Sequence, residues 1–294
     1  MSAVRPTPFS PPAGVVPTVP SGRCRISVLM PVYNAAEFVR EAVESIQAQT
    51  VQDFELVIVE DGSTDSSRKL LEELAAQDSR IRLIRNPENR GIVYSLNRGL
   101  EECRGDYIVR MDADDAALPH RLQNQVAVLE SDPDILALGS SVTYIDREGN
   151  DLGLIRRSET PRTPLLKSFL LHPTVVIRNR ALKNGGLKYQ ERFRYAEDYF
   201  LWLQLSQRGK IGVLDQVVMK YRITQSVTRL QHLKGVLWAT LKVKWAGVFE
   251  LGLRPSARDI LRFLGECGLL MVPSGLVNWI YRRVTFGKGR PVKL

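Results

Sequence analysis

The chain has 294 residues, of which 44% are hydrophobic, so it can bury a full α/β core and is not a largely disordered protein. The formal net charge is +9, and the sequence contains neither the GxGxxG motif of dinucleotide-binding domains nor the GxxxxGKS/T motif of P-loop proteins. Three cysteines (Cys24, Cys103 and Cys267) and no secretory signal pattern predict a cytoplasmic protein without disulfide bonds.

The first 22 residues differ in composition from the rest of the chain. They contain six prolines and a single charged residue, Arg5, which is typical of a flexible, extended segment. We therefore expect a disordered proline-rich leader at residues 1–22. After it we expect a main domain at residues 23–228 and a basic helical tail at residues 229–294.

Strand and helix patterns alternate from residue 26 onward. Strands are predicted where apolar and β-branched residues run together, and helices where apolar residues recur every three or four positions. In chain order the predicted elements are a strand at 26–32, a helix at 37–49, a strand at 54–60, a helix ending near 77, a strand at 81–85, a helix at 92–102 and a strand at 107–111. Ser63 or Thr64 is expected to cap the helix that ends near residue 77.

This alternation predicts the fold class. Four strand–helix repeats are typical of a parallel sheet flanked by helices, so we expect an α/β fold. In open sheets of this kind, ligands bind beyond the carboxyl ends of the strands. Asp61 and Asp112 both follow predicted strand ends. We therefore expect the two acidic loops to face one crevice.

The segment Tyr107–Asp115, with the sequence YIVRMDADD, ends an apolar strand in three carboxylates. Asp112, Asp114 and Asp115 would repel one another at this strand end unless a divalent cation lay between them. Hard oxygen ligands with open positions suit Mg²⁺ or Mn²⁺ that carries substrate phosphates, so the pattern indicates a diphosphate ligand. The alternative is a solvated acidic turn before a helix that begins near Leu118.

A second pair of acids, Glu197 and Asp198, precedes a predicted buried helix. Acids in a first turn stabilise a helix through its dipole, which is the structural interpretation of this pair. A carboxylate held within hydrogen-bond reach of a hydroxyl can also act as a general base, which is the catalytic interpretation.

The net charge is concentrated in the tail. From Arg229 onward the chain has 12 Lys or Arg and three Asp or Glu, which leaves 29 of the 41 basic residues and 29 of the 32 acidic residues before it. Leucines recur there at helical spacing between lysines, which fits a helix on the main domain or a helix on anionic lipid. No nucleic-acid-binding module is recognisable, so we expect no nucleic acid partner.

An apolar segment at residues 267–281 is 15 residues long and contains Pro273, so it is short for a transmembrane helix. Five basic residues and no acid follow it. Basic residues beside an apolar segment are two modest membrane signals. They lead to the hypothesis of peripheral attachment to the inner face of the cytoplasmic membrane.

Five short motifs occur in order along the chain. They are Pro31–Asn34 (PVYN), Glu60–Asp65 (EDGSTD), the NRG pair at 89–91 and 97–99, Asp112–Asp115 (DADD) and Ala196–Asp198 (AED). This order resembles that of family 2 glycosyltransferases, and the resemblance covers about residues 26–226. It implies a GT-A fold with a Rossmann-like, mostly parallel sheet. It also implies a nucleotide-binding half at about 23–118 and an acceptor half at about 119–228.

The resemblance implies roles on the donor side. Pro31, Val32 and Tyr33 resemble the wall against which a nucleotide base packs, although strand-end packing is the structural alternative. Asp61 resembles the carboxylate that accepts a base N–H, which favours a UDP- or dTDP-linked sugar; a turn-forming Asp is its alternative. Asp112 resembles the ribose contact.

The resemblance also implies a metal site and a general base. Asp114 resembles the residue that binds Mn²⁺ or Mg²⁺, which would stabilise charge on the departing nucleoside diphosphate. Asp198 resembles the base that takes the proton from the acceptor hydroxyl, and a single displacement would invert the anomeric carbon. Glu197 would support this base or bind the acceptor.

Three further residues are candidates for contact with the acceptor or the diphosphate: Arg90, His172 and Arg222. Each has a structural alternative, as a turn residue, a loop histidine or a solvent-facing arginine. Many family members have a histidine two residues after this last arginine, whereas this chain has Thr224. Any metal or phosphate role of that histidine is therefore in doubt here.

The predicted function is an inverting, metal-dependent glycosyltransferase that moves a sugar from a nucleotide-diphosphate donor to a hydroxyl of a saccharide or lipid-linked acceptor. One alternative is a catalytically inactive nucleotide- or glycan-binding module of the same fold. Another is an α/β signalling domain with an acidic pocket. The presence of Asp112, Asp114 and Asp198 together favours the enzyme.

Overall fold

The computed structural model describes residues 24–156, 165, 168, 170–224, 232–273, 275 and 276. The predicted leader at 1–22 and the basic chain end after residue 276 lie outside these ranges.

The first half of the described chain alternates strands and helices, as the sequence predicts. Its elements are β1 (Ile26–Val32), α1 (Val39–Gln47), β2 (Phe54–Asp61), α2 (Ser67–Gln77), β3 (Ile81–Asn86), α3 (Ile92–Glu102) and β4 (Tyr107–Arg110). β1 pairs in parallel with both β2 and β4, and β2 pairs in parallel with β3. The expected parallel α/β unit is therefore confirmed for these four strands.

The second half adds strands of both directions. Its elements are β5 (Ala116–Ala117), α4 (Arg121–Ser131), β6 (Ile135–Ile145), β7 (Asp151–Ile155), η1 (His172–Thr174), β8 (Val176–Arg178), α5 (Asn179–Lys183), η2 (Glu191–Phe193), α6 (Glu197–Ser206), β9 (Lys210–Arg222), α8 (Leu233–Phe249) and α9 (Ala257–Met271). β8 pairs antiparallel with β4 and β6, whereas β9 runs parallel to β6. The sheet order is β3-β2-β1-β4-β8-β6-β9-β5, with β7 paired to β6.

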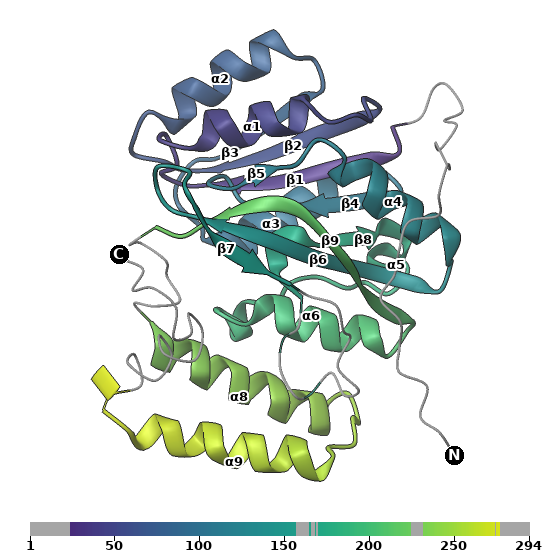
Figure 1. Ribbon diagram of the computed structural model, residues 1–294, viewed down its shortest axis with the longest axis vertical. Coiled ribbons are helices and arrows are strands. Elements are labelled where there is room, and N and C mark those ends of the chain that lie inside the picture. Colours follow the sequence, from purple (N-terminus) through teal and green to yellow (C-terminus); the bar gives the residue numbers. More distant parts are fainter. Residues whose placement is uncertain are drawn as a thin grey trace.

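Helices cover both faces of this sheet (Figure 1). Because successive side chains of a strand point to opposite faces, β1 contributes to two cores. Val28 and Met30 pack with α1 and α2 on one face, and Leu29 packs with α3 and α6 on the other. The central strand is therefore buried on both sides, which holds its carboxyl end rigidly.

α6 is buried between the sheet and α8, which confirms the predicted buried helix. Leu201 and Trp202 belong to the core on the sheet side, whereas Phe200 and Leu203 pack with Val243 of α8. α9 lies on the outer side of α8 (Figure 1). In the described part of the chain, no helix is both long and apolar enough to cross a membrane.

Candidate active site

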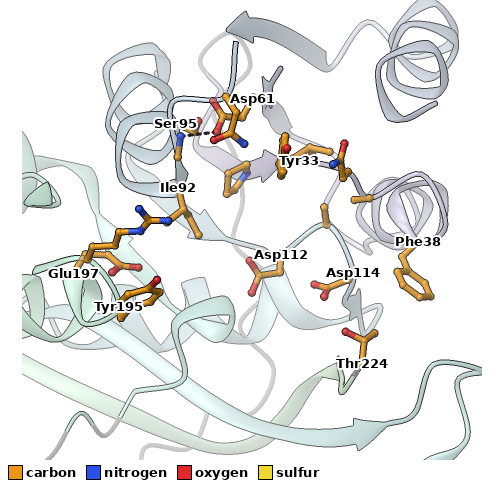
Figure 2. A pocket seen from close by; sticks show the side chains of 18 of the residues that line it. Tyr33, Phe38, Asp61, Ile92, Ser95, Asp112, Asp114, Tyr195, Glu197 and Thr224 are labelled. Carbon is orange, nitrogen blue, oxygen red and sulfur yellow. Dashed lines mark hydrogen bonds between the residues drawn. The ribbon is translucent and has the colours of Figure 1, made fainter. Parts of the chain in front are cut away.

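A cavity of about 670 Å³ opens where β1, β2 and β4 end. Seven of the predicted site residues line it: Pro31, Val32, Tyr33, Asp61, Asp112, Asp114 and Glu197. Four others are not among the lining residues: Arg90, His172, Asp198 and Arg222. The expectation that the loops of Asp61 and Asp112 face one crevice is confirmed. Figure 2 shows Asp112 between Asp114 and Glu197, with Tyr33 and Asp61 on the opposite wall.

The loop after β1 places a solvent-exposed aromatic ring in the cavity wall. Tyr33 is 47% exposed, although it follows a fully buried strand end. The next residue, Asn34, has a φ of 48°, and its backbone N–H donates to Ser63 Oγ over 3.1 Å. Its Oδ1 accepts from the backbone N–H of Thr64 over 2.8 Å. The EDGSTD segment therefore holds the loop that carries Tyr33.

The same contacts correct one prediction. α2 begins at Ser67, and the residue before it, Ser66, makes no side-chain capping bond. Ser63 and Thr64 do not cap α2, because their polar groups bind Asn34. The local sequence was compatible with a helix cap or with a contact to another loop, and the structure shows the contact with Asn34 in the loop after β1.

Asp61 anchors the NRG loop from within the cavity wall. Its Oδ1 accepts from the backbone N–H of Arg90 over 3.0 Å and from Asn86 Nδ2 over 2.6 Å. Its Oδ2 accepts from the backbone N–H of Gly91 over 2.8 Å. The side chain of Arg90 lies 4.6 Å from the ring centre of Tyr94. The backbone of the NRG loop, rather than its arginine side chain, thus contacts the predicted base-binding carboxylate.

The acidic cluster consists of Asp112, Asp114 and Asp115, whose carboxylate oxygens come within 4.8 Å of one another. Burial raises the pKa of Asp114 to about 6, and the charge of Asp112 adds to the shift. Burial raises the pKa of Asp115 well above its ordinary value, and the charges of Asp114 and Asp112 add to the shift. Asp115 Oδ2 is buried and has no hydrogen-bond partner among the described residues. The cluster is therefore poorly compensated by the protein, as expected where a cation binds.

Arg222 holds the backbone around this cluster. Its N–H donates to Asp115 Oδ1 over 2.8 Å, and its Nε donates to the carbonyl of Asp114 over 2.9 Å. Nη1 reaches the carbonyls of Asp146 and Arg147, and Nη2 pairs with Glu41. Arg222 is only 3% exposed. A contact with diphosphate stays a prediction, and it would require Arg222 to release one of these partners.

Arg110 lies beneath the cluster and was not predicted as a site residue. Its Nη2 lies 2.5 Å from Asp112 Oδ1, and the side chain is 3% exposed. Its Nε and Nη1 are buried without a hydrogen-bond partner among the described residues. Burial raises the pKa of Asp114 and of Glu197, and the charge of Arg110 offsets part of that rise. The clue in the sequence was a cation inside an otherwise apolar strand.

Residues at the start of α6 contribute another part of the cavity lining. Tyr195 lines the cavity with a φ of 78°, which is strained for a residue with a side chain, and its ring stacks on His232. Glu197 follows at the first turn of α6; burial and the charge of Asp198 raise its pKa to about 7. Asp198 Oδ1 accepts from the backbone N–H of Tyr199 over 2.7 Å. The two neighbouring acids therefore occupy different environments.

His172 lies apart from the cavity lining. Its Nε2 is 2.9 Å from the hydroxyl of Tyr189, and its ring also contacts Trp202. Thr224, the residue that replaces the family histidine, does line the cavity, as do Arg194 and Val236. Sequence patterns gave no sign of the last two, because η2 and α8 reach the cavity only through packing on α6.

Comparisons with known proteins found related sequences and related folds. The sequence model described as Glycosyl transferase family 2 matches residues 27–185. An uncharacterized glycosyltransferase of Methanocaldococcus jannaschii is 33% identical over 231 residues, which cover 75% of this chain and 79% of the relative. The amylovoran biosynthesis glycosyltransferase AmsE of Erwinia amylovora is 31% identical over 202 residues, which cover 67% of this chain and 75% of AmsE.

Solved structures share the fold. S. aureus TarS 1-349 in complex with UDP-GlcNAc has a TM-score of 0.68 at 20% identity, covering 89% of this chain and 80% of that chain. The mannosyltransferase PcManGT from Pyrobaculum calidifontis, in complex with GDP-Man and Mn²⁺, has a TM-score of 0.58 at 18% identity, covering 94% of this chain and 88% of that chain. These likenesses confirm the predicted GT-A-like α/β fold.

Proposed function

This chain belongs to glycosyl transferase family 2 and is a glycosyltransferase, and we propose a reaction for it from its cavity. It transfers a sugar from a nucleotide-diphosphate donor to a hydroxyl of a saccharide or lipid-linked acceptor, in one displacement that inverts the anomeric carbon. The observation that carries the proposal is one cavity lined by an exposed ring at Tyr33, by Asp112 and Asp114, and by Glu197. The ring suits a nucleotide base, the two aspartates suit a diphosphate with its cation, and the glutamate suits the acceptor.

The donor is a UDP- or dTDP-linked sugar in this proposal. The Tyr33 ring offers a face for stacking, and Asp61 offers carboxylate lone pairs to the imide N–H of uracil or thymine. Asp61 already accepts three protein hydrogen bonds, so the base contact would be an additional one. The TarS complex with UDP-GlcNAc supports the nucleotide class, while the GDP-Man complex of PcManGT makes guanine the competing choice.

A divalent cation fits the acidic cluster. The three carboxylates provide hard oxygen ligands within 4.8 Å of one another, and the buried Oδ2 of Asp115 has no partner among the described residues. Asp112 and Asp114 would hold Mn²⁺ or Mg²⁺ from the cavity side. The bound cation would supply positive charge to the departing diphosphate. Arg222 keeps this loop in place through the carbonyl of Asp114.

Asp198 is the proposed base, and Glu197 binds the acceptor. As the hydroxyl attacks the anomeric carbon, the base takes its proton and the bond to the diphosphate breaks. Glu197 lines the cavity directly, so it can accept a hydrogen bond from the sugar. Both acids stand in the first turn of the buried helix α6, although only Glu197 is among the residues that line the cavity, so Asp198 would act from beside it.

The acceptor is proposed from relatives. AmsE is named for amylovoran biosynthesis, and a further relative, 28% identical over 248 residues, is named chondroitin synthase of Escherichia coli. Both names support a saccharide acceptor and a role in polysaccharide biosynthesis.

The test separates donor binding from transfer. Thermal unfolding is measured with UDP, dTDP, GDP and CDP, with and without Mn²⁺, for the native chain, Asp114→Ala and the exposed control Glu101→Ala. One nucleotide should raise Tm in the presence of Mn²⁺, and only Asp114→Ala should lose the effect. Asp198→Asn should keep this shift and lose transfer to a saccharide acceptor. Retained transfer in Asp198→Asn would move the base role to Glu197, and no shift with any nucleotide would favour an inactive glycan-binding module of the same fold.

A further inference from the structure

The outermost helices present large apolar side chains to solvent. On α8, Trp238, Trp245 and Phe249 are 54%, 54% and 69% exposed. Their spacing of seven and four residues places them on one side of the helix, and the rings of Trp245 and Phe249 lie 4.7 Å apart. The opposite side of α8, with Ala239 and Val243, packs on α6. α8 is therefore apolar on both its inner and its outer side.

α9 shows the same feature. Leu261, Leu264 and Met271 are 73%, 60% and 88% exposed, and their spacing places them on the outer side of the helix. The inner side instead carries Glu266, which pairs with the buried Lys244 of α8. This arrangement inverts the usual pattern of a surface helix, in which charged residues face water and apolar residues face the core.

A groove between the two helices joins these surfaces. It has a volume of about 720 Å³ and is lined mainly by apolar side chains, among them Trp238, Trp245, Phe263 and Met271. We call the exposed apolar side chains of α8 and α9, together with this groove, the α8–α9 face. A patch this rich in aromatic and aliphatic side chains indicates an interaction surface.

The charges around the α8–α9 face are positive. Its acids are all engaged: Glu250 pairs with Arg192, Asp259 closes the capping box of α9, and Glu266 pairs with Lys244. Lys242 is exposed beside Trp238, with its Nζ 5.6 Å from the ring centre. Arg254 and Arg258 are exposed on the α8–α9 turn and on α9, and the exposed Arg262 shares Glu266 with Lys244.

We propose that the α8–α9 face binds the surface of a membrane that contains anionic lipid. Tryptophan, phenylalanine and leucine side chains insert at the level of the headgroups, and the surrounding Lys and Arg attract the lipid charge. Another protein surface would have to match this excess of basic charge, whereas an anionic bilayer does so without specific shape. The inference stands independently of the proposed donor and base.

The α8–α9 face and the active site share the helix α8. Val236, in the first turn of α8, lines the donor cavity, and Trp245 and Phe249 lie further along the same helix. Binding a membrane through α8 and α9 therefore sets the distance of the cavity from the lipid surface. An acceptor carried on a lipid would then be presented to the cavity at a fixed height.

The test is sedimentation of the full chain with vesicles. We expect binding to vesicles of phosphatidylcholine with phosphatidylglycerol at low salt, weaker binding as salt rises, and little binding to phosphatidylcholine alone. The double variant Leu261→Asp/Leu264→Asp should reduce the partition constant at least about tenfold. The matched control is Leu154→Asp, because Leu154 is 55% exposed on β7, outside the face. It should bind within about twofold of the native chain.

A second measurement locates the contact. Brominated lipid quenches tryptophan emission only at close range, and Trp202 is fully buried. In a Trp279→Phe background, anionic brominated vesicles should quench the emission of Trp238 and Trp245. Replacing both by Phe should remove the quenching, because only the buried tryptophan then remains.

Three results would overturn the proposal. The full chain could fail to bind anionic vesicles at low salt. Binding could survive in the double variant unchanged, which would assign it to the basic chain end. Or the chain could form a dimer that Leu264→Asp abolishes, with no vesicle binding, which would make the α8–α9 face a contact between two copies. An unchanged nucleotide-induced Tm shift in each variant would show that the cavity is intact.

Discussion

Arg110 forms an ion pair with Asp112, a residue of the cavity lining, with Nη2 of the arginine 2.5 Å from Oδ1 of the aspartate. Arg110 is the last residue of β4, so the strand that ends in the acidic cluster also supplies the cation beneath it. Arg110 neutralises the charge of Asp112, whereas Asp114 and Asp115 keep raised pKa values. A bound cation would complete the balance.

The first prediction concerns this pair. Arg110→Met should lower the free energy of unfolding by about 3 kcal/mol without added metal, because it leaves Asp112 without its counter-charge in a partly buried cluster. In an Asp112→Asn background the same change should cost at least about 1 kcal/mol less. Urea unfolding of the four proteins measures this coupling. Equal costs in both backgrounds would show that the two side chains do not interact energetically.

The second prediction concerns Asp61. Asp61→Asn replaces one acceptor oxygen by an NH₂ group, and because the backbone N–H groups of Arg90 and Gly91 bind different oxygens, the NH₂ group then faces one of these two donors. We expect a loss of about 2 kcal/mol in stability and at least tenfold weaker nucleotide binding, because the NRG loop is released. Hydrogen exchange of these two amides should speed up. Unchanged exchange would mean that the loop is held by other contacts.

The third prediction concerns Gly62. A Cβ at this position would lie 2.4 Å from the backbone carbon of Glu88, and φ is +68°. Gly62→Ala should therefore destabilise the fold by more than about 2 kcal/mol. Gly186→Ala is the control, since Gly186 has a φ of +58° but nothing within 4 Å of an added Cβ. It should cost only about 1 kcal/mol, and similar losses in both variants would remove the steric explanation.

The fourth prediction is a pH dependence. The pKa of Glu197 is about 7 in the fold, above its ordinary value of 4.5, because burial disfavours the charged form. The folded state therefore loses stability from Glu197 as pH rises from about 4.5 through about 7, and the cost is fully present above that range. Glu197→Gln removes this cost. Its free energy of unfolding should match that of the native chain near pH 4 and exceed it by on the order of 2 kcal/mol at pH 8.

Chemical unfolding across pH 4–8, with chelator present, measures this difference. Glu101→Gln, on the exposed surface of α3, should show a constant difference from the native chain. A constant difference for Glu197→Gln as well would show that this carboxyl titrates normally.

The fifth prediction concerns the residue that departs from the family. Thr224 lines the same cavity as Asp114. Thr224→His should add an imidazole ligand and tighten Mn²⁺ binding about tenfold, as titrated by electron paramagnetic resonance. Thr224→Val is the control for loss of the hydroxyl. Equal affinity in the two variants would place this residue out of reach of the cation.

The sequence by itself determined the local elements and the edge at which ligands bind. Strand and helix periods are local properties, so β1 and α3 begin and end at the predicted residues. The rule that parallel strands place their carboxyl ends at one edge then brought Asp61 and Asp112 together. Neither step required knowledge of distant contacts.

Tertiary structure decided the rest. The antiparallel insertion of β8 between β4 and β6 pairs residues 38 to 71 positions apart. The hydrogen-bond partners of Arg222 lie 75 or more positions away from it, and no local pattern encodes such contacts. The sequence also could not show which of the neighbouring acids Glu197 and Asp198 faces the cavity. Consecutive residues on a helix point about 100° apart, so only one of them can face a given wall. The packing of α6 between the sheet and α8 turned Glu197 toward the cavity.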